Sequence, residues 1–149
     1  MMIWVDGDAC PKAIKEVLFR AAVRRKTLLT LVANQNMTLP SSPFIKKCIV
    51  GAGFDVADNE IVHQLEPGDL VITADIPLAD AVITKGGIAL DPRGELYTHQ
   101  NIKQKLAIRN LNESLRSGGM LKSGQAPFSA KEVQKFSNNL DKFLTKKQL

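Results

Sequence analysis

The sequence predicts an α/β fold with a mostly parallel central sheet and helices at the C-terminal end. Three observations support this fold class. Short apolar runs typical of buried strands alternate with amphipathic helical patterns over residues 1–98. Turns rich in Gly and Pro separate these segments, and two longer helical patterns follow after residue 98. The 149 residues suffice for one domain with its own core.

A strand, helix, strand unit opens the chain. Residues 2–5 form a short apolar run, and Pro11 suits the first position of a helix. The helix is expected to end near Lys26, and residues 27–33 are rich in β-forming residues, which predicts a buried strand. The apolar positions of the helix recur at helical spacing: Ile14, Val17, Leu18, Ala21 and Ala22.

Two further units are predicted in the middle of the chain. Residues 44–50 indicate a third strand or an irregular edge, and Asp55 can cap a helix over residues 56–65. Residues 70–74 form the clearest core strand. A short helix over residues 77–84 should follow it and end at Gly86-Gly87, before an apolar run at residues 88–90 and a turn at residues 91–94.

The C-terminal segment predicts two helices. Thr98 can cap a helix that runs to about Arg116, and Ser129 with Glu132 forms a capping box for the last helix. That last helix carries its apolar residues on one stripe, which is typical of a docking face: Val133, Phe136, Leu140, Phe143 and Leu144.

Acidic and basic residues are unevenly distributed along the chain. Residues 1–98 hold ten Lys/Arg and twelve Asp/Glu, whereas residues 99–149 hold ten Lys/Arg and three Asp/Glu. A basic C-terminal extension behind a more acidic front half suits an enzyme whose substrate is a polyanion. The alternative is that the lysines only keep the C-terminal helices soluble.

Composition favours a cytoplasmic protein with no membrane span. No apolar stretch approaches about 18 residues, and the N-terminal residues lack the pattern of a secretory signal. The two cysteines, Cys10 and Cys48, are expected to be reduced thiols, because they form neither a CxxC pair nor a zinc-ligand cluster.

Several common chemistries are not supported by the sequence. It has no P-loop, and Val56 stands where the third glycine of a dinucleotide-binding motif would fall, so no nucleotide cofactor is expected. It has neither a G-x-S-x-G elbow nor an HExxH motif, and its only histidines are His63 and His99.

Aspartates stand at the exits of the predicted strands. Asp6 and Asp8 follow the first strand, and Asp75 follows residues 70–74. Asp58 ends a third segment with acidic residues, residues 53–58. The carboxyl ends of parallel strands share one edge of a sheet, so these side chains can converge and hold a hard cation such as Mg²⁺ or Mn²⁺.

Each aspartate also has a purely structural interpretation. Asp6 and Asp8 flank a glycine and can build a turn, Asp55 can be only a helix cap, and Asp80 can be a solvated helix residue. Asp69 lies in a Pro-Gly turn and is interpreted as structural.

Three segments give the chain a family resemblance: Ile3-Trp4-Val5-Asp6-Gly7-Asp8-Ala9-Cys10-Pro11, Gly53-Phe54-Asp55-Val56-Ala57-Asp58, and residues 68–79. The chain resembles the bacterial YaiI/YqxD family of uncharacterised proteins, which is grouped with PIN-like nuclease domains. The resemblance extends to the final Phe and Leu positions. It implies a single three-layer α/β/α PIN-like domain over residues 1–149, with residues 99–149 as a basic helical extension.

The resemblance also implies a function and a set of site residues. PIN-like domains bind Mg²⁺ or Mn²⁺ through acidic residues and cut RNA. By this resemblance the catalytic acids are Asp6, Asp58 and Asp75. Two further acids are added as metal ligands: Asp8 and Asp80. Three basic residues are predicted to contact RNA phosphates: Lys85, Arg93 and Arg109.

Three hypotheses of function remain open from the sequence. The first is a metal-dependent ribonuclease or related phosphodiesterase. The second is a non-catalytic RNA-binding module, against which the low aromatic content of 5% counts. The third is a small-molecule phosphatase, in which the basic segment would serve as a homodimer or partner surface.

Overall fold

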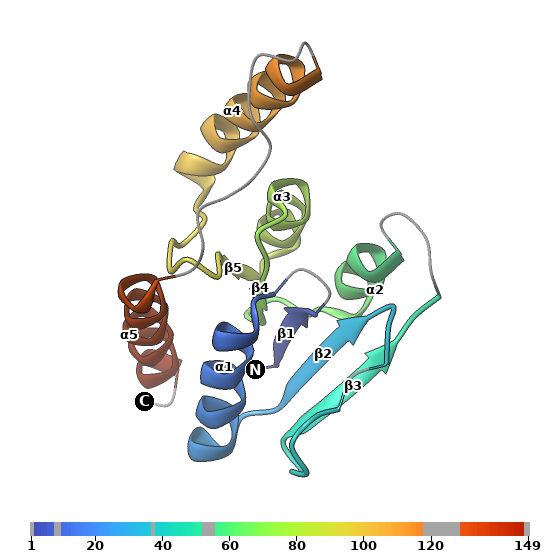
Figure 1. The fold of residues 1–149 in the computed structure, drawn as a ribbon, viewed down its shortest axis with the longest axis vertical. Coiled ribbons are helices and arrows are strands. Elements are labelled where there is room, and N and C mark those ends of the chain that lie inside the picture. Colours follow the sequence, from blue (N-terminus) through green and yellow to red (C-terminus); the bar gives the residue numbers. More distant parts are fainter. Residues whose placement is uncertain (1, 8–9, 37, 52–55, 118–128, 148–149) are drawn as a thin grey trace.

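Five parallel strands form the centre of the molecule (Figure 1). The computed structural model describes residues 2–7, 10–36, 38–51, 56–117 and 129–147. Asp8 and Asp55 therefore lie outside the described residues. The strands are β1 (Ile3–Asp6), β2 (Leu29–Ala33), β3 (Ile45–Ile49), β4 (Leu70–Ile72) and β5 (Ile88–Leu90), and their order in the sheet is β3-β2-β1-β4-β5.

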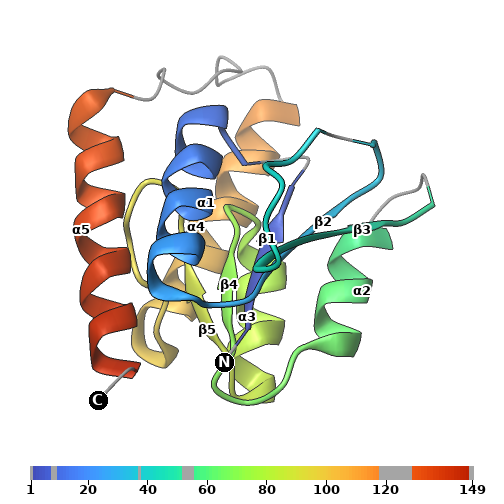
Figure 2. The same cartoon turned by 90° about the horizontal axis from the view of Figure 1, so that it is seen from below.

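Helices cover both faces of this sheet. They are α1 (Lys12–Arg25), α2 (Val56–Gln64), α3 (Ile76–Lys85), α4 (His99–Ser117) and α5 (Ala130–Lys147). Helices α1 and α5 lie on one side, and α2 and α3 lie on the other, with α4 against α3 (Figure 2). The three-layer α/β/α architecture is confirmed, and every strand pair of the described sheet is parallel.

Alternating residues of the strands belong to two separate hydrophobic cores, one on each face of the sheet. In β1, Ile3 and Val5 pack with α1 and α5, while Trp4 packs with the helices of the opposite face. Strand β4 repeats the pattern, with Val71 pointing to the α2 side. Because successive strand side chains point to opposite faces, the continuous apolar runs of the sequence are those of strands buried on both sides.

Helix ends follow the capping signals of the sequence. Helix α1 stops at Lys26, which adopts a left-handed conformation with φ of 53°. Helix α3 begins at Asp75, whose side chain accepts a hydrogen bond from the backbone N–H of Leu78, and it ends at Gly86 with φ of 97°. Strand β4 ends two residues before the predicted limit, because the chain turns where the N–H of Asp75 bonds the hydroxyl of Thr73.

The last helix is part of the core rather than an appendage. Phe136, Leu140 and Leu144 are fully buried against the sheet face that α1 also covers, as the apolar stripe predicted. Arg24 of α1 forms an ion pair of 2.7 Å with Asp141 of α5. Among the described helices, none combines the length and the apolar character needed to cross a membrane.

Candidate active site

The strand order reverses its direction between β1 and β4. From β1 the chain proceeds to β2 and β3 on one side, and β4 and β5 extend the sheet on the other. Beyond their carboxyl ends, β1 and β4 therefore connect to strands on opposite sides of the sheet. The carboxyl edge of the sheet at such a switch point is the usual ligand position in open α/β sheets, and we refer to this place as the crevice.

Asp6 and Asp75 flank this crevice. Asp6 is the last residue of β1 and is only 7% exposed, and Asp75 follows β4 at the start of α3. The hydroxyl of Thr73 donates to Oδ2 of Asp6 at 3.3 Å and accepts from the backbone N–H of Asp75 at 2.9 Å. The structure thus joins two sequence-predicted acids, 69 positions apart in the numbering, through one buried hydroxyl.

The carboxylate of Asp75 has one oxygen committed to the fold. Its Oδ1 atom accepts from the N–H of Leu78 at 3.0 Å, which caps α3. Within the described part of the chain, no donor bonds its Oδ2 atom. That oxygen can therefore serve a cation or a water while the cap is kept.

Gly7 lets the end of β1 lie close to β2. A Cβ atom at Gly7 would stand 2.5 Å from Cδ2 of Leu31, far inside van der Waals contact. The N–H of Gly7 also donates to the carbonyl of Val32 at 2.8 Å. A side chain at this position would push the end of β1 away from β2. The glycine therefore lets the chain directly after Asp6 stay against β2.

A third acid stands at the exit of the next strand. Asp91 follows β5, accepts from the hydroxyl of Tyr97 at 2.9 Å, and accepts from the N–H of Arg93 at 2.6 Å. Burial raises the pKa of the Tyr97 phenol, and the charges of Asp91 and Asp75 raise it further, so the phenol stays protonated. Sequence reasoning treated Asp91 only as a turn residue. The sequence nevertheless indicates Asp91 as a site candidate, because it follows the apolar run at residues 88–90 as Asp6 and Asp75 follow the other apolar runs.

Asp58 and Asp80 lie on the helices of the same sheet face. Asp58 is half-buried in the first turn of α2, which starts beyond the carboxyl end of β3 and hence at the same edge as Asp6. By the alternation along β1, the side chain of Asp6 points to this face too. Asp80 is half-buried in α3, about 7 Å along the helix axis from Asp75.

Two of the predicted phosphate contacts are engaged elsewhere. Lys85 ends α3, and its Nζ atom donates to the carbonyl of Val62 at 2.5 Å, at the edge of the sheet opposite the aspartates. Arg93 forms an ion pair with Glu132 of α5. The structure does not bring Lys85 to the crevice, and the side chain of Arg109 lies outside the described part.

Asp69 is structural, as its turn position indicated. It is buried at the start of β4, and its carboxylate accepts from the N–H of Met2 at 3.0 Å, from Nε1 of Trp4 at 3.1 Å and from the N–H of Glu66 at 2.9 Å. Three donors hold this carboxylate at the amino edge of the sheet, away from the crevice.

The donors at the crevice fit a hard divalent cation. Carboxylate and hydroxyl oxygens from Asp6, Asp75 and Thr73 are the ligand type of Mg²⁺ and Mn²⁺. Among the residues with described positions, no group of three or more Asp, Glu, His or Cys is arranged to hold a metal. Magnesium usually needs only one or two protein carboxylates, because waters and substrate phosphates complete its shell.

Comparison with known proteins places the chain in a family. A model of the family described as "Uncharacterized BCR, YaiI/YqxD family" matches residues 4–146. The chain belongs to the YaiI/YqxD family. The resemblance noted in the sequence is thereby confirmed at the level of this family.

Curated relatives of this YaiI/YqxD protein match it over nearly its whole length. A UPF0178 protein of Maridesulfovibrio salexigens is 64% identical over 146 residues, which are 98% of this chain and 97% of the relative. A UPF0178 protein of Shewanella amazonensis is 59% identical over 98% of each chain. One of Aeromonas hydrophila subsp. hydrophila is 56% identical over 100% of this chain and 99% of the relative. No solved structure matches the chain significantly.

Proposed function

We propose that this YaiI/YqxD protein is a divalent-metal-dependent phosphodiesterase of the PIN-like type that cleaves RNA. The observation that carries the proposal is that the hydroxyl of Thr73 bonds both the carboxylate of Asp6 and the backbone N–H of Asp75 at the switch point of the sheet. Two acids from different strand exits, one of them nearly buried, form a site suited to a cation.

The predicted acids and Thr73 have distinct tasks in this proposal. Asp6 and Asp75 would hold Mg²⁺ or Mn²⁺, and Asp8 and Asp58 would complete the shell or orient the attacking water. Thr73 fixes the Asp6 carboxylate through its hydrogen bond. Such ions lower the pKa of a bound water and stabilise the leaving oxygen, so phosphodiester cleavage needs no histidine.

Charge favours RNA over a small substrate. The chain has a formal net charge of +5 despite the acids at the crevice, and it carries exposed lysines on the surfaces of α1, α4 and α5. A long polyanion can contact such surfaces and the crevice together, whereas a mononucleotide reaches the crevice alone.

Cleavage of RNA by wild type and an Asp75→Asn variant tests the proposal. Asparagine caps helices about as well as aspartate, so α3 should remain intact while the charge is lost. We expect Mn²⁺-dependent cleavage of a single-stranded RNA by the wild type and a loss of at least about 100-fold in the variant.

Asp141→Asn is the matched control for this experiment. It removes the same charge from α5, on the sheet face opposite the crevice, and affects the ion pairs of Asp141 with the exposed Arg24 and the half-buried Arg25. The control should cleave like the wild type. A folded Asp75→Asn variant with wild-type cleavage rates would refute the assignment.

A further inference from the structure

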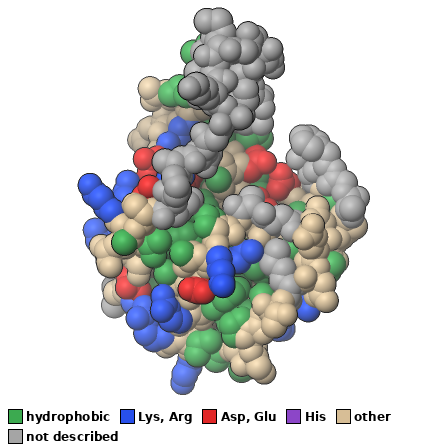
Figure 3. Space-filling view, viewed as in Figure 1, with side chains coloured by type: hydrophobic (Ala, Val, Ile, Leu, Met, Phe, Trp, Pro, Cys, Tyr) green, Lys and Arg blue, Asp and Glu red, His purple; other side chains and the backbone are tan. Residues whose placement is uncertain are grey.

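Basic residues of the front half concentrate on one helix. Residues 12–26, which comprise α1 and its C-cap, hold six Lys/Arg and a single acid, Glu16. At the far end of the helix, Arg24 and Arg25 both pair with Asp141 of α5. Lys12 and Lys15 stand at the other end of the helix, in its first turn. Figure 3 shows Lys and Arg side chains beside hydrophobic ones on the face that carries α1.

A cavity of about 350 Å³ runs between the first half of α1 and the connection from β2 to β3. Its walls carry lysines on one side and apolar groups on the other. We call this cavity the α1 groove, and it is lined by Lys12, Lys15, Glu16, Phe19, Thr38, Leu39 and Pro40.

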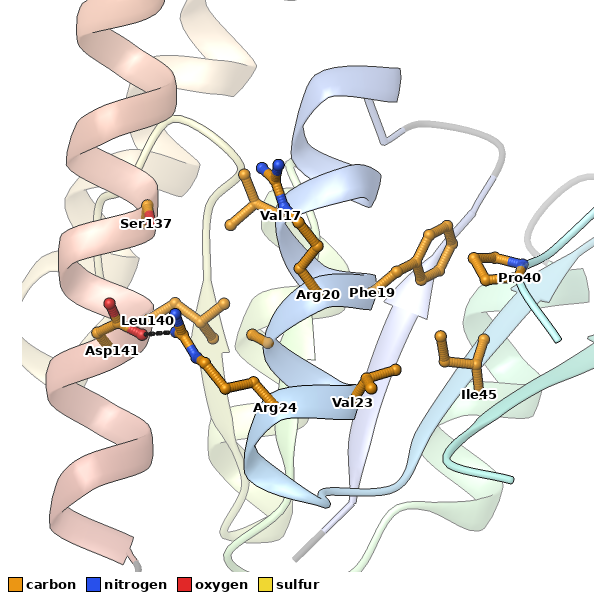
Figure 4. Close-up of a pocket in the computed structure, with 11 residues that line it drawn as sticks. Val17, Phe19, Arg20, Val23, Arg24, Pro40, Ile45, Ser137, Leu140 and Asp141 are labelled. Atoms are coloured by element: carbon orange, nitrogen blue, oxygen red, sulfur yellow. Dashed lines mark hydrogen bonds and ion pairs between the residues drawn. The ribbon is translucent and has the colours of Figure 1, made fainter. Parts of the chain in front are cut away.

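A second cavity continues the α1 groove along the helix. It has a volume of about 570 Å³ and shares Phe19 and Pro40 with the α1 groove. Figure 4 shows the ring of Phe19 directed toward Pro40, with Arg20 on the neighbouring part of α1. The two cavities together follow most of the roughly 21 Å length of α1.

The α1 groove starts at the same edge of the sheet as the candidate active site. Helix α1 starts after the loop that leaves β1 at Asp6, so Lys12 stands at the carboxyl edge of the sheet. Lys15 lies slightly less than one full helical turn further along α1. A strand of RNA that crosses this edge can reach both the crevice, on the face of α2, and the groove, on the face of α1.

We propose that the α1 groove binds a single-stranded stretch of RNA next to the cleaved phosphate. The proposal rests on the proposed function and adds to it a binding track and a strand preference. Lys12 and Lys15 contact backbone phosphates, and Phe19 with Pro40 provides an apolar wall for a base or ribose. Positive charge with an aromatic or apolar surface is the combination by which proteins hold single strands without reading their sequence.

The α1 groove offers an RNA base an accessible aromatic ring, which Trp4 and Tyr97 do not. Trp4 and Tyr97 are 5% and 4% exposed, so neither ring is available as a platform for bases. Phe19 is half-buried and lines the open cavity instead. Lys85, a predicted phosphate contact, lies at the opposite sheet edge, whereas Lys12 and Lys15 lie at the edge that carries Asp6.

Binding to a labelled single-stranded RNA, measured by fluorescence anisotropy in EDTA, tests the groove without the metal. The variant is Lys12→Gln with Lys15→Gln, which keeps the aliphatic stems and removes both charges. We expect about tenfold weaker binding at low salt and a slope of log K against log salt that is smaller by about 1.4, for two lost phosphate contacts.

Lys131→Gln with Lys142→Gln is the matched control. Both lysines are exposed on α5, so the control loses the same net charge away from the α1 groove. It should retain wild-type affinity and slope. An unchanged affinity and slope in the groove variant, or an equal loss in the control, would overturn the proposal.

Two competitors separate the ligand classes. Single-stranded RNA should displace the labelled strand better than a duplex of the same sequence. Equal displacement by polyglutamate at matched charge would instead indicate an acidic protein partner and would overturn the assignment to RNA.

The two proposals fail in different ways. Groove-dependent binding by a wild type that never cleaves RNA would uphold the groove and reject the nuclease. Cleavage that Lys12→Gln with Lys15→Gln leaves unaltered, together with unaltered binding, would uphold the nuclease and reject the groove.

Discussion

The hydroxyl of Thr73 links the carboxylate of Asp6 to the backbone of Asp75. It donates to Asp6 and accepts from the N–H of Asp75. Thr73→Val keeps the shape and removes this buried link, which should lower the free energy of unfolding by about 1–3 kcal/mol and weaken Mn²⁺ binding. Thr73→Ser retains the hydroxyl and should stay close to wild type. Denaturant unfolding and metal titration check both variants, and equal behaviour of Val and Ser would contradict the linking role.

The raised pKa of the Cys10 thiol predicts that the folded protein loses stability at alkaline pH. Burial raises the pKa of its thiol from 9.0 to about 12, and the charge of Asp6 adds to this while Lys15 opposes it. Between these values the unfolded chain releases the proton and the folded chain keeps it, so stability falls as pH rises. The slope from this group is about 1.4 kcal/mol per pH unit.

Denaturant unfolding from pH 8 to pH 11 measures this effect. Cys10→Ala should show a shallower decline than the wild type above pH 9. Cys48→Ala, which alters a half-buried thiol on β3, is the control and should keep the wild-type decline. Parallel curves for wild type and Cys10→Ala would contradict the raised pKa.

Individual site residues were predictable only where a pattern repeats. Asp6 and Asp75 follow apolar runs, and the sequence therefore indicated both. Thr73 was not identified, because its role depends on the pairing of β1 with β4, which no local pattern encodes. Lys85 is basic and follows a helix, but its distance from the crevice depends on the direction of α3 across the sheet.

At the scale of elements, α5 stabilises the face of the sheet that it shares with α1. Phe136 is fully buried in that core. Phe136→Ala should lower the free energy of unfolding by about 3–5 kcal/mol, because it leaves a large cavity. Lys142→Ala, on the exposed side of the same helix, should change it by less than about 0.5 kcal/mol. Chemical denaturation measures both, and a small effect of Phe136→Ala would show that α5 is not a structural part of the core.

Helices and strands were predicted well where burial and capping agree. The boundaries of α1 and α3 follow Pro11, Lys26, Asp75 and Gly86, which terminate helices through local backbone chemistry. Strand β3 was ambiguous because it lies at the edge of the sheet, and Lys46 and Lys47 interrupt its apolar pattern.

At the scale of the whole molecule, the arrangement of charge differs from its order along the chain. The sequence separates an acidic front half from a basic extension. The fold places Asp6, Asp75 and Asp91 at the carboxyl edge of the sheet and gathers six basic residues of the front half on α1 and its cap. The strand order that creates the crevice could not be read from the sequence, because parallel pairing joins segments that are far apart in the chain.

Calorimetric titration with Mn²⁺ and Mg²⁺, in parallel for wild type and Asp75→Asn, tests whether the carboxylate of Asp75 holds a cation. We expect binding by the wild type that is lost in a variant whose unfolding curve is unchanged. Equal binding by the two proteins would contradict it, because a cation would then be held without the carboxylate that the switch point of the sheet presents.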